Sequence, residues 1–342
     1  MPKTGMIAGV IIVIAIIAVA AAYVATQPGA PVTTTAKQWK VALLLPDVIT
    51  DLTWNGPAYQ AVSRLVAEGI ADKFSYTEQV TVPDAVRIAS GYASEGYDLI
   101  IQHGSQFVDT TREAAQKYPN SYFVTTAMLA PDFPPNASVV WVYLEEAYYL
   151  LGILAGRMTK TNVVGTLCPL EVPGIVEWSK GFKAGVLSVN PNAKVLYAVT
   201  GSFMDATLGK EAAMAQIEAG ADFLAPMTDG PVLGAIMAAQ ETGKAYVFGC
   251  EGDTHSINPN IIVTSAIWDS YAHYKTIMLD IKAGQFKPRY EADLKSGGAT
   301  ITPFYALKDQ IPQSVLDEME KAKQDIISGK INVKELVQSI TL

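Results

Sequence analysis

Hydrophobic and polar positions divide this chain of 342 residues into an apolar N-terminal segment and a long body of alternating elements. Met6–Ala25 is a run of twenty residues without a charge, shortly after Lys3. As a helix rising about 1.5 Å per residue, this run matches the thickness of the hydrocarbon core of a bilayer. We expect residues 1–25 to form a membrane anchor. Cleavage as a secretory signal near Ala20–Ala25 is the alternative, although the apolar part of such signals usually spans about 7–15 residues.

A polar linker follows the apolar segment. Residues 26–38 are rich in Thr and Pro, and a sequence typical of a folded domain begins at Trp39. An anchor followed by a short linker predicts that the body lies at the cell membrane, on its extracellular face. The first forty residues contain no Cys, which excludes lipid attachment through an N-terminal Cys.

In the body, short apolar runs alternate with segments of helical periodicity. A continuous apolar run such as Val41–Leu45, stopped by Pro46, is typical of a strand buried on both faces. The expected strands are Val41–Leu45, Leu99–His103, Tyr122–Thr126, Val139–Tyr143, Val163–Leu167, Val195–Val199, Phe223–Ala225, Tyr246–Cys250, Ile261–Ala266 and Thr300–Phe304. The expected helices are Gly56–Glu68, Pro83–Glu95, Phe107–Tyr118, Glu145–Met158, Ile175–Leu187, Ala206–Ala219, Val232–Thr242, Tyr271–Ala283 and Gln313–Ser328.

Strict alternation of strands and helices predicts an α/β fold of mainly parallel sheets covered by helices. The elements group into two blocks, and the late segments are left over to return between them. We therefore expect two doubly wound lobes around a central cleft. The first lobe would comprise residues 39–143 and about 267–296, and the second residues 144–266 and about 297–342.

Composition narrows the classes of partner. The chain has 25 basic and 33 acidic residues, a net charge of −8, and no stripe rich in Lys and Arg, so nucleic acid is not expected as a partner.

Cys168 and Cys250 end two strands that we expect to be separated by one other strand. Next-nearest strands lie about 9–10 Å apart, too far for a disulfide, so both thiols should be free and buried. Asn136-Ala137-Ser138 is a possible glycosylation sequon.

Ligands of such folds bind beyond the carboxyl ends of the strands, so the loops at these ends are the candidate site. In the first block, Trp54 and Asn55 follow the first strand, and Phe107 follows the second expected strand. Trp54 in a polar loop suggests a ligand contact. The alternative is that Asp51 and Asn55 only cap the next helix and that Trp54 packs in the core. Taken alone, Phe107 is more typical of helix packing.

The second block repeats this arrangement. Aromatic rings and carboxylates follow four of its strands, and each carboxylate taken alone could cap a helix or lie in a solvated loop. The candidates are Phe203, Asp205, Asp229, Glu251, Asp253 and Trp268.

Together these residues suit a flat ring rich in nitrogen. Aromatic faces stack on heterocycles, a contact worth about 1–3 kcal/mol for a nucleic acid base. Carboxylates and the Asn amide accept hydrogen bonds from ring N–H and amino groups. Lys210 is the only basic residue near these loops, which argues against an anionic ligand. No metal site is expected, because the three His residues lack metal-ligand spacing.

About residues 39–300 resemble the basic membrane protein family of substrate-binding proteins, which serve ABC importers of nucleosides and purines. The stretches that carry the resemblance include Asp51-Leu-Thr-Trp54-Asn55-Gly-Pro-Ala-Tyr59, Gly104-Ser-Gln-Phe107, Leu151-Gly-Ile-Leu-Ala-Gly156, Gly181-Phe-Lys-Ala-Gly185, Gly201-Ser-Phe203-Met-Asp205 and Gly249-Cys-Glu-Gly-Asp253.

The resemblance implies a type I periplasmic-binding-protein fold, a purine base or nucleoside as ligand, the permease of an ABC importer as partner, and no cofactor. By resemblance, Phe203 would stack on the ligand. Nucleoside-binding members have a Lys near position 268, which here is Trp268, and this is similar to the branch proposed to take a bare purine base. Glu251 replaces the usual Asp. The lipid-bearing Cys of the family is also missing, and the apolar anchor would replace it.

Two other classes remain open. Paired carboxylates can serve acid–base catalysis, as in a nucleoside-processing enzyme, but the first strand lacks a Gly-rich phosphate turn and no Gly-x-Ser-x-Gly motif occurs. A two-lobed domain could also be a ligand-sensing receptor ectodomain, although the chain ends at Leu342 without an appended signalling domain.

Overall fold

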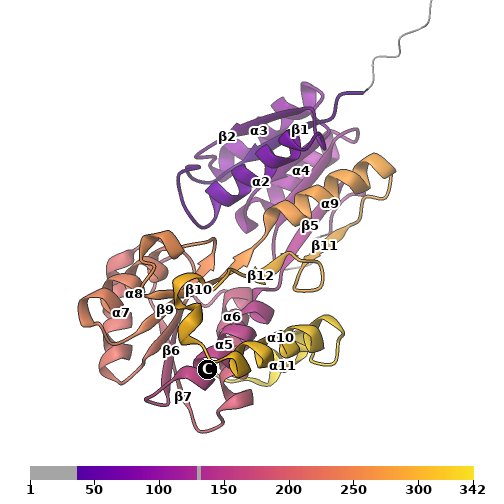
Figure 1. Ribbon diagram of the computed structural model, residues 1–342. Helices are drawn as coiled ribbons and strands as arrows, with labels where there is room; N and C mark the ends of the chain where they lie inside the picture. The colour runs from indigo at the N-terminus through magenta and orange to yellow at the C-terminus, as the bar shows by residue number, and fades with distance from the viewer. Residues whose placement is uncertain (1–36, 129–131) are drawn as a thin grey trace, which may run out of the picture. The chain divides into compact units, whose positions relative to one another are not determined.

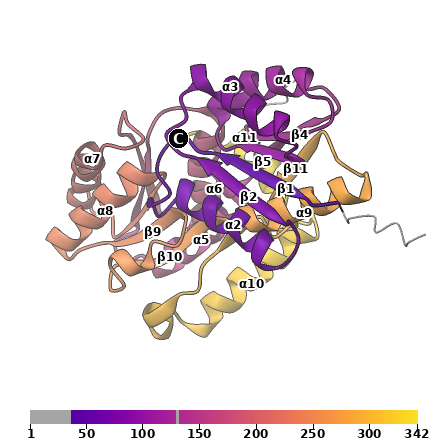
Figure 2. The same cartoon turned by 90° about the horizontal axis from the view of Figure 1, so that it is seen from above.

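The strands of the body form two six-stranded sheets. The computed structural model describes residues 37–128 and 132–342, and Figures 1 and 2 show it in two views. The anchor expected at residues 1–25 lies outside the described residues. Among the residues described, no helix is both long enough and apolar enough to cross a membrane.

The first sheet has the order β11-β5-β4-β3-β1-β2, and all neighbouring strands in it are parallel. Its strands are β1 (Lys40–Leu44), β2 (Lys73–Thr77), β3 (Leu99–Gln102), β4 (Tyr122–Thr126), β5 (Ala137–Val142) and β11 (Arg289–Ala292). Its helices are α2 (Asn55–Ala67), α3 (Val82–Ser94), α4 (Val108–Lys117) and α9 (Ser270–Ala283), with the short η1 (Ser105–Phe107). We call this sheet and its helices the first lobe.

The alternation of side chains along β1 distributes the core of the first lobe over both faces of the sheet. Val41 and Leu43 belong to the cluster that contains the buried residues of α2 and α9. Ala42 and Leu44 belong to a second cluster, with the buried residues of α3 and α4. Successive residues of a strand point to opposite faces, so a strand that is apolar throughout is covered on both sides. This confirms the prediction made from the apolar run at the start of the body.

The second sheet has the order β12-β10-β9-β8-β6-β7 and is parallel except for the antiparallel pair β10 and β12. Its strands are β6 (Val163–Cys168), β7 (Lys194–Val199), β8 (Phe223–Pro226), β9 (Tyr246–Glu251), β10 (Ile262–Trp268) and β12 (Ala299–Ile301). The remaining helices are α5 (Leu144–Met158), α6 (Pro173–Val189), α7 (Ala206–Glu218), α8 (Asp229–Thr242), α10 (Gln313–Ile327) and α11 (Val333–Ser339), with η2 (His255–Ile257) and η3 (Tyr305–Gln310). We call this group the second lobe.

Helices α5 and α6 of the second lobe pack with their backbones in close contact. A Cβ atom at Gly181 would collide with the carbonyl oxygen of Glu145, and one at Gly185 with that of Tyr149. From the other helix, a Cβ at Gly152 would collide with the carbonyl oxygen of Phe182. Glycine is required at these positions because no side chain fits between the two backbones.

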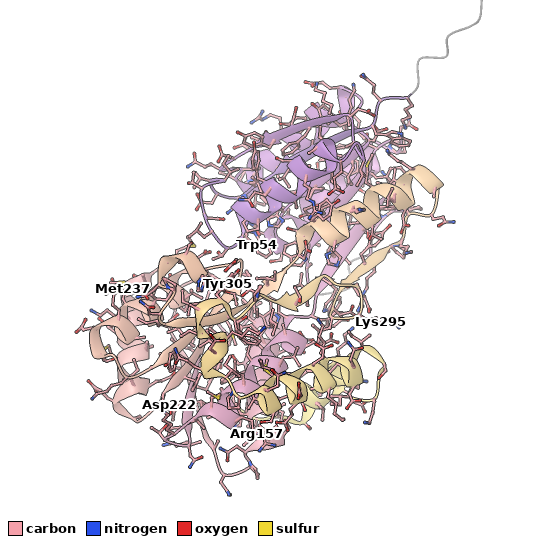
Figure 3. The ribbon with its side chains drawn as sticks, viewed as in Figure 1. Trp54, Arg157, Asp222, Met237, Lys295 and Tyr305 are labelled. Atoms are coloured by element: carbon pink, nitrogen blue, oxygen red, sulfur yellow. The ribbon has the colours of Figure 1, made fainter. Side chains whose placement is uncertain are left out.

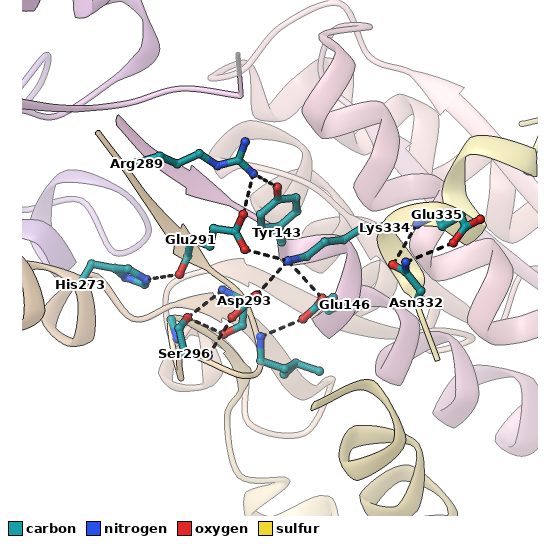
Figure 4. Close-up of polar contacts among 12 residues, drawn as sticks. Tyr143, Glu146, His273, Arg289, Glu291, Asp293, Ser296, Asn332, Lys334 and Glu335 are labelled. Atoms are coloured by element: carbon teal, nitrogen blue, oxygen red, sulfur yellow. Dashed lines mark hydrogen bonds and ion pairs between the residues drawn. The ribbon is translucent and has the colours of Figure 1, made fainter. Parts of the chain in front are cut away.

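The chain passes between the two sheets three times in its described part: from β5 to α5, from β10 to α9 and from β11 to β12. Lys334 of α11 contacts the first and last of these crossovers (Figure 4). Its Nζ lies 2.9 Å from Asp293, 3.4 Å from Glu291 and 3.8 Å from Glu146. The same ammonium group lies 3.7 Å from the centre of the Tyr143 ring. One cation of α11 therefore holds together Glu146 of α5, Glu291 of β11 and Asp293 directly after β11.

The two Cys residues are free and buried, as predicted. Cys168 is the last residue of β6 and Cys250 the next to last of β9, and β8 lies between these strands. The glycosylation sequon is less favourable in the structure than in the sequence. The amide nitrogen of Asn136 donates to three carbonyl oxygens, of Ala115, Tyr118 and Ser121, and Ser138 is fully buried. A glycan on Asn136 would have to break these hydrogen bonds.

Candidate functional site

The loop between β1 and α2 is organised by Asp51. Its carboxylate accepts hydrogen bonds from the backbone N–H groups of Trp54 (3.2 Å), Asn55 (3.0 Å) and Gly56 (2.8 Å) at the start of α2. Of the two capping residues that the sequence suggested, Asp51 therefore has this role and Asn55 does not. Asn55 is instead the first residue of α2, it is buried, and its side-chain amide donates to Asp51. Asp51 fixes the backbone of Trp54, and its negative charge lies at the positive end of the helix dipole.

Trp54 belongs to a cluster of four aromatic rings, which we call the aromatic cluster: Trp54, His103, Trp268 and Tyr274. The Trp54 ring lies 4.3 Å from His103 and 5.1 Å from Trp268, measured between ring centres. His103 and Trp268 are stacked, with centres 5.2 Å apart and an angle of 5° between the planes. Trp54 remains half-buried, whereas the other three rings are buried. The structure thus brings together the candidate residues Trp54 and Trp268, which are 214 positions apart in the sequence.

His103 and Tyr274 are members of this cluster that the sequence did not indicate. The Nδ1 atom of His103 lies 2.8 Å from the Tyr274 hydroxyl, and Nε2 lies 3.1 Å from the Trp54 carbonyl oxygen. A carbonyl oxygen only accepts, so Nε2 carries the hydrogen and Nδ1 accepts from the Tyr274 hydroxyl. Burial of the imidazole lowers the pKa of His103 to about 3. This His is therefore a neutral structural element near pH 7.

Two carboxyl groups of the second lobe face the loop of the first lobe that contains Asp51. The Thr53 hydroxyl donates to the Asp229 carboxylate, which begins α8. Gly252 lies against the same loop, since a Cβ at this position would collide with the Leu52 carbonyl oxygen. Glu251 precedes Gly252 and is 6% exposed. We call Asp51, Asp229 and Glu251 the acidic group.

The two carboxyl groups of the second lobe share an environment that disfavours negative charge. Burial, followed by the charge of Asp51, raises the pKa of Asp229 against the effect of the Thr53 hydrogen bond. Burial and the charges of Asp229 and Asp51 raise the pKa of Glu251 well above its usual range. Buried like charges without a cation are costly, and such clusters are frequent at functional sites.

The backbone is strained at the same place. Thr228, directly before Asp229, has a φ of 62°, and Glu251 has a φ of 63°. Positive φ is uncommon outside Gly, and for a β-branched residue such as Thr it is an outlier. Strain of this kind persists where the surrounding structure enforces it, often at ligand sites. Thr228 lies two residues after β8, and Glu251 is the last residue of β9, so both strained residues lie at the carboxyl ends of strands of the second sheet.

Phe203 lies beside Asp229, because the backbone N–H of Gly230 donates to the Phe203 carbonyl oxygen (2.8 Å). Its ring is half-buried at the edge of the core. Asp205 caps α7 by accepting from the N–H groups of Thr207 (2.8 Å) and Leu208 (3.2 Å), in agreement with the capping alternative.

Asp253 and Phe107 have other neighbours. The Asp253 carboxylate accepts hydrogen bonds from the Tyr305 hydroxyl and from the His255 N–H. Figure 3 labels Tyr305 on η3, and Trp54 at the start of α2. Phe107 is fully buried, with 0% of its surface exposed. It lies in the core cluster with Ala42, Leu44 and the buried residues of α3. This is the helix-packing interpretation of Phe107.

The electrostatics of the site exclude strong attraction for an anion. Lys210, the one basic residue expected near these loops, makes an ion pair with Glu241 at 2.5 Å. The charges acting on Asp229 and Glu251 are negative. In residues 37–128 and 132–342, no group of three or more His, Cys, Asp or Glu side chains is arranged to hold a metal ion. The arrangement suits a ligand that donates hydrogen bonds and presents a flat face.

Two α/β lobes that present aromatic rings and carboxylates where their strand ends meet define a two-lobed solute-binding fold. The chain belongs to the Bmp family, the PnrA-like substrate-binding proteins of ABC transporters, whose family model matches residues 38–336. The resemblance inferred from the sequence motifs is thereby confirmed.

Individual relatives cover most of the chain. The ABC transporter nucleoside-binding protein BmpA of Lactococcus lactis subsp. cremoris is 28% identical over 306 residues, which cover 83% of this chain and 86% of BmpA. A purine-binding protein of Brucella abortus is 27% identical over 287 residues, covering 82% of this chain and 79% of that protein. Among solved structures, a solute-binding protein of an ABC transporter system from Conexibacter woesei has a TM-score of 0.74 and 25% identity, covering 86% and 98% of the two chains.

Proposed function

We propose that this protein captures a purine base or nucleoside between its two lobes and delivers it to the permease of an ABC importer. The observation that carries the proposal is the convergence of the aromatic cluster and the acidic group on one loop, Asp51 to Asn55. Trp54 in this loop contacts Trp268, and Thr53 contacts Asp229. A purine offers a flat face for the rings and N–H donors for the carboxyl groups.

The relatives support the same ligand class, since one is named for nucleoside binding and another for purine binding. By the family resemblance, Trp268 stands where nucleoside-binding members have a Lys, and the loss of that Lys favours a bare base over a nucleoside. A ligand that contacts Trp54 from one lobe and Asp229 from the other stabilises the arrangement in which the lobes are together, which shifts the population toward it.

The same proposal places the folded body outside the cytoplasm, with residues 1–25 as its membrane anchor. It also makes the protein a carrier and not an enzyme, so a bound nucleoside should be recovered intact. Fractionation of cells expressing the full chain would test the anchor. Chromatography of a nucleoside after incubation with the protein would test for catalysis.

A thermal-shift screen tests the proposed ligand class. We expect adenine or guanine to raise the melting temperature of the protein, because a ligand that binds only the folded state stabilises it. Ribose, glucose and amino acids should leave the melting temperature unchanged. A shift with a sugar or an amino acid and none with purines would overturn the proposal.

A further inference from the structure

Glu251 is the one carboxyl group of the acidic group that lacks a hydrogen-bond partner. It is more than nine-tenths buried, yet no hydrogen bond reaches its carboxyl group from residues 37–128 and 132–342. Asp51, by contrast, accepts from three backbone N–H groups, and Asp229 accepts from Thr53. The Glu251 carboxyl oxygens are not among the fully buried unpaired atoms of the described residues, so a ligand at the surface of the site can complete their hydrogen bonds.

The groups that face Glu251 all oppose a negative charge on it. Asp229 of α8 and Asp51 of the loop before α2 are the charges that act on it, and both are acidic. Its other titratable neighbours are Cys250 in β9 and Tyr148 of α5, and burial raises the pKa of each of them well above its usual range. Both are therefore uncharged near pH 7. The backbone at Glu251 is held at positive φ, which fixes the direction in which its side chain leaves the strand.

We propose that Glu251 binds the ligand as a neutral carboxylic acid, donating one hydrogen bond through its O–H and accepting one through its C=O. This inference rests on the proposed function and specifies the ligand edge that the site recognises. A neutral acid matches a ring edge that presents an acceptor beside a donor. Adenine has such an edge at its ring nitrogen and amino group, and guanine has one at its carbonyl oxygen and ring N–H.

An ionised Glu251 would recognise a different edge. A carboxylate only accepts hydrogen bonds, so it would pair with two adjacent N–H donors, as guanine offers at its ring N–H and amino group. Adenine has no such pair of donors on neighbouring ring positions. The protonation state of Glu251 is therefore a determinant of specificity, and the neutral form is compatible with both purines.

The Glu251→Gln variant tests this inference, because an amide also offers one donor and one acceptor. Calorimetric titration of adenine into the full-length protein in detergent, at pH 7, should give an affinity within about threefold of the wild type. The control is Glu211→Gln, on the exposed side of α7, which should bind as the wild type does. A loss of more than about tenfold in Glu251→Gln alone would show that a group with one donor and one acceptor cannot replace the carboxyl group, and would overturn the inference.

Infrared difference spectroscopy provides an independent readout. The wild-type protein with adenine at pH 7 should show the C=O band of a protonated carboxylic acid, and this band should be missing in Glu251→Gln. Absence of the band from the wild type would overturn the inference even if the variant does not fold. If adenine and guanine both fail to bind the wild type, the proposed function fails instead, and the band in the ligand-free protein still reports the protonation state of Glu251.

Discussion

The His103 imidazole donates a hydrogen bond to the carbonyl oxygen of Trp54 over 3.1 Å, and the rings of the two residues lie 4.3 Å apart. His103 directly follows β3, the third strand of the first lobe, whereas Trp54 lies in the loop that follows the first strand. This contact links two strand ends and orients the one half-buried ring of the aromatic cluster.

Replacing His103 should destabilise the protein and weaken ligand binding. In His103→Phe the ring remains, but the Trp54 carbonyl and the Tyr274 hydroxyl lose their partners. Each buried group left without a hydrogen bond costs about 1–3 kcal/mol. Tyr274→Phe removes only one of these bonds and should cost less. Urea unfolding measures both free energies, and equal stability of His103→Phe and the wild type would show that these bonds contribute nothing.

The buried His103 also predicts a dependence of stability on pH. Burial lowers its pKa to about 3 in the folded protein, below about 6.5 in an unfolded chain. The folded state thus binds fewer protons, and the stability that this His contributes is present above pH 6.5 and lost as the pH falls toward 3. The loss is about 1.4 kcal/mol per pH unit within this window. His103→Gln should show a shallower decline in urea unfolding at pH 7, 5 and 4, and parallel profiles would contradict this origin.

Trp54→Ala should weaken purine binding at least about tenfold while the fold is retained, because it removes a stacking face worth about 1–3 kcal/mol. Tyr76→Ala is a matched control, since Tyr76 is an exposed aromatic residue of the edge strand β2 in the same lobe. Titration calorimetry gives the affinities, and circular dichroism checks the fold. Unchanged affinity in Trp54→Ala would remove Trp54 from the site.

Lys334→Met should destabilise the contact between α11 and the crossovers shown in Figure 4. The variant leaves Glu146, Glu291 and Asp293 near one another without their common cation. Removing one partner from a partly buried ion pair leaves uncompensated charge, and we expect a loss on the order of 2 kcal/mol in urea unfolding. Lys330→Met is the control, because Lys330 pairs with Asp325 at the surface, where such pairs contribute about 0–1 kcal/mol. Equal effects of the two variants would argue against a special role of Lys334.

The sequence was most informative where burial determines the pattern. Apolar runs such as that of β1 predicted the central strands, because a strand covered on both faces must be apolar throughout. The edge strand β2, with the sequence KFSYT, was not predicted, since its exposed face allows polar residues. β11 and α11 were also missed, because four or seven residues are too few to establish a period.

For the candidate site, the rule that ligands bind at the carboxyl ends of strands predicted Trp54, Asp229, Glu251 and Trp268, and their role as ligand contacts stays a prediction. It could not identify Tyr274, which lies one turn into α9 and reaches His103 only through tertiary packing. His103 was missed for a related reason, since it was counted as the last residue of a buried strand. The sequence suggested both Asp51 and Asn55 as caps of α2, because both residue types are good caps, and only the buried position of Asn55 inside the helix distinguishes them.

Calorimetric titration of adenine and guanine into the wild type and Asp229→Ala most directly tests whether carboxyl groups of the second lobe and rings of the first hold a purine. We expect at least one purine to bind the wild type, and Asp229→Ala to bind it at least about tenfold more weakly, as loss of a buried hydrogen-bonding partner requires. Equal binding by both proteins, or binding of neither purine to the wild type, would contradict a purine site between Trp54 and Asp229.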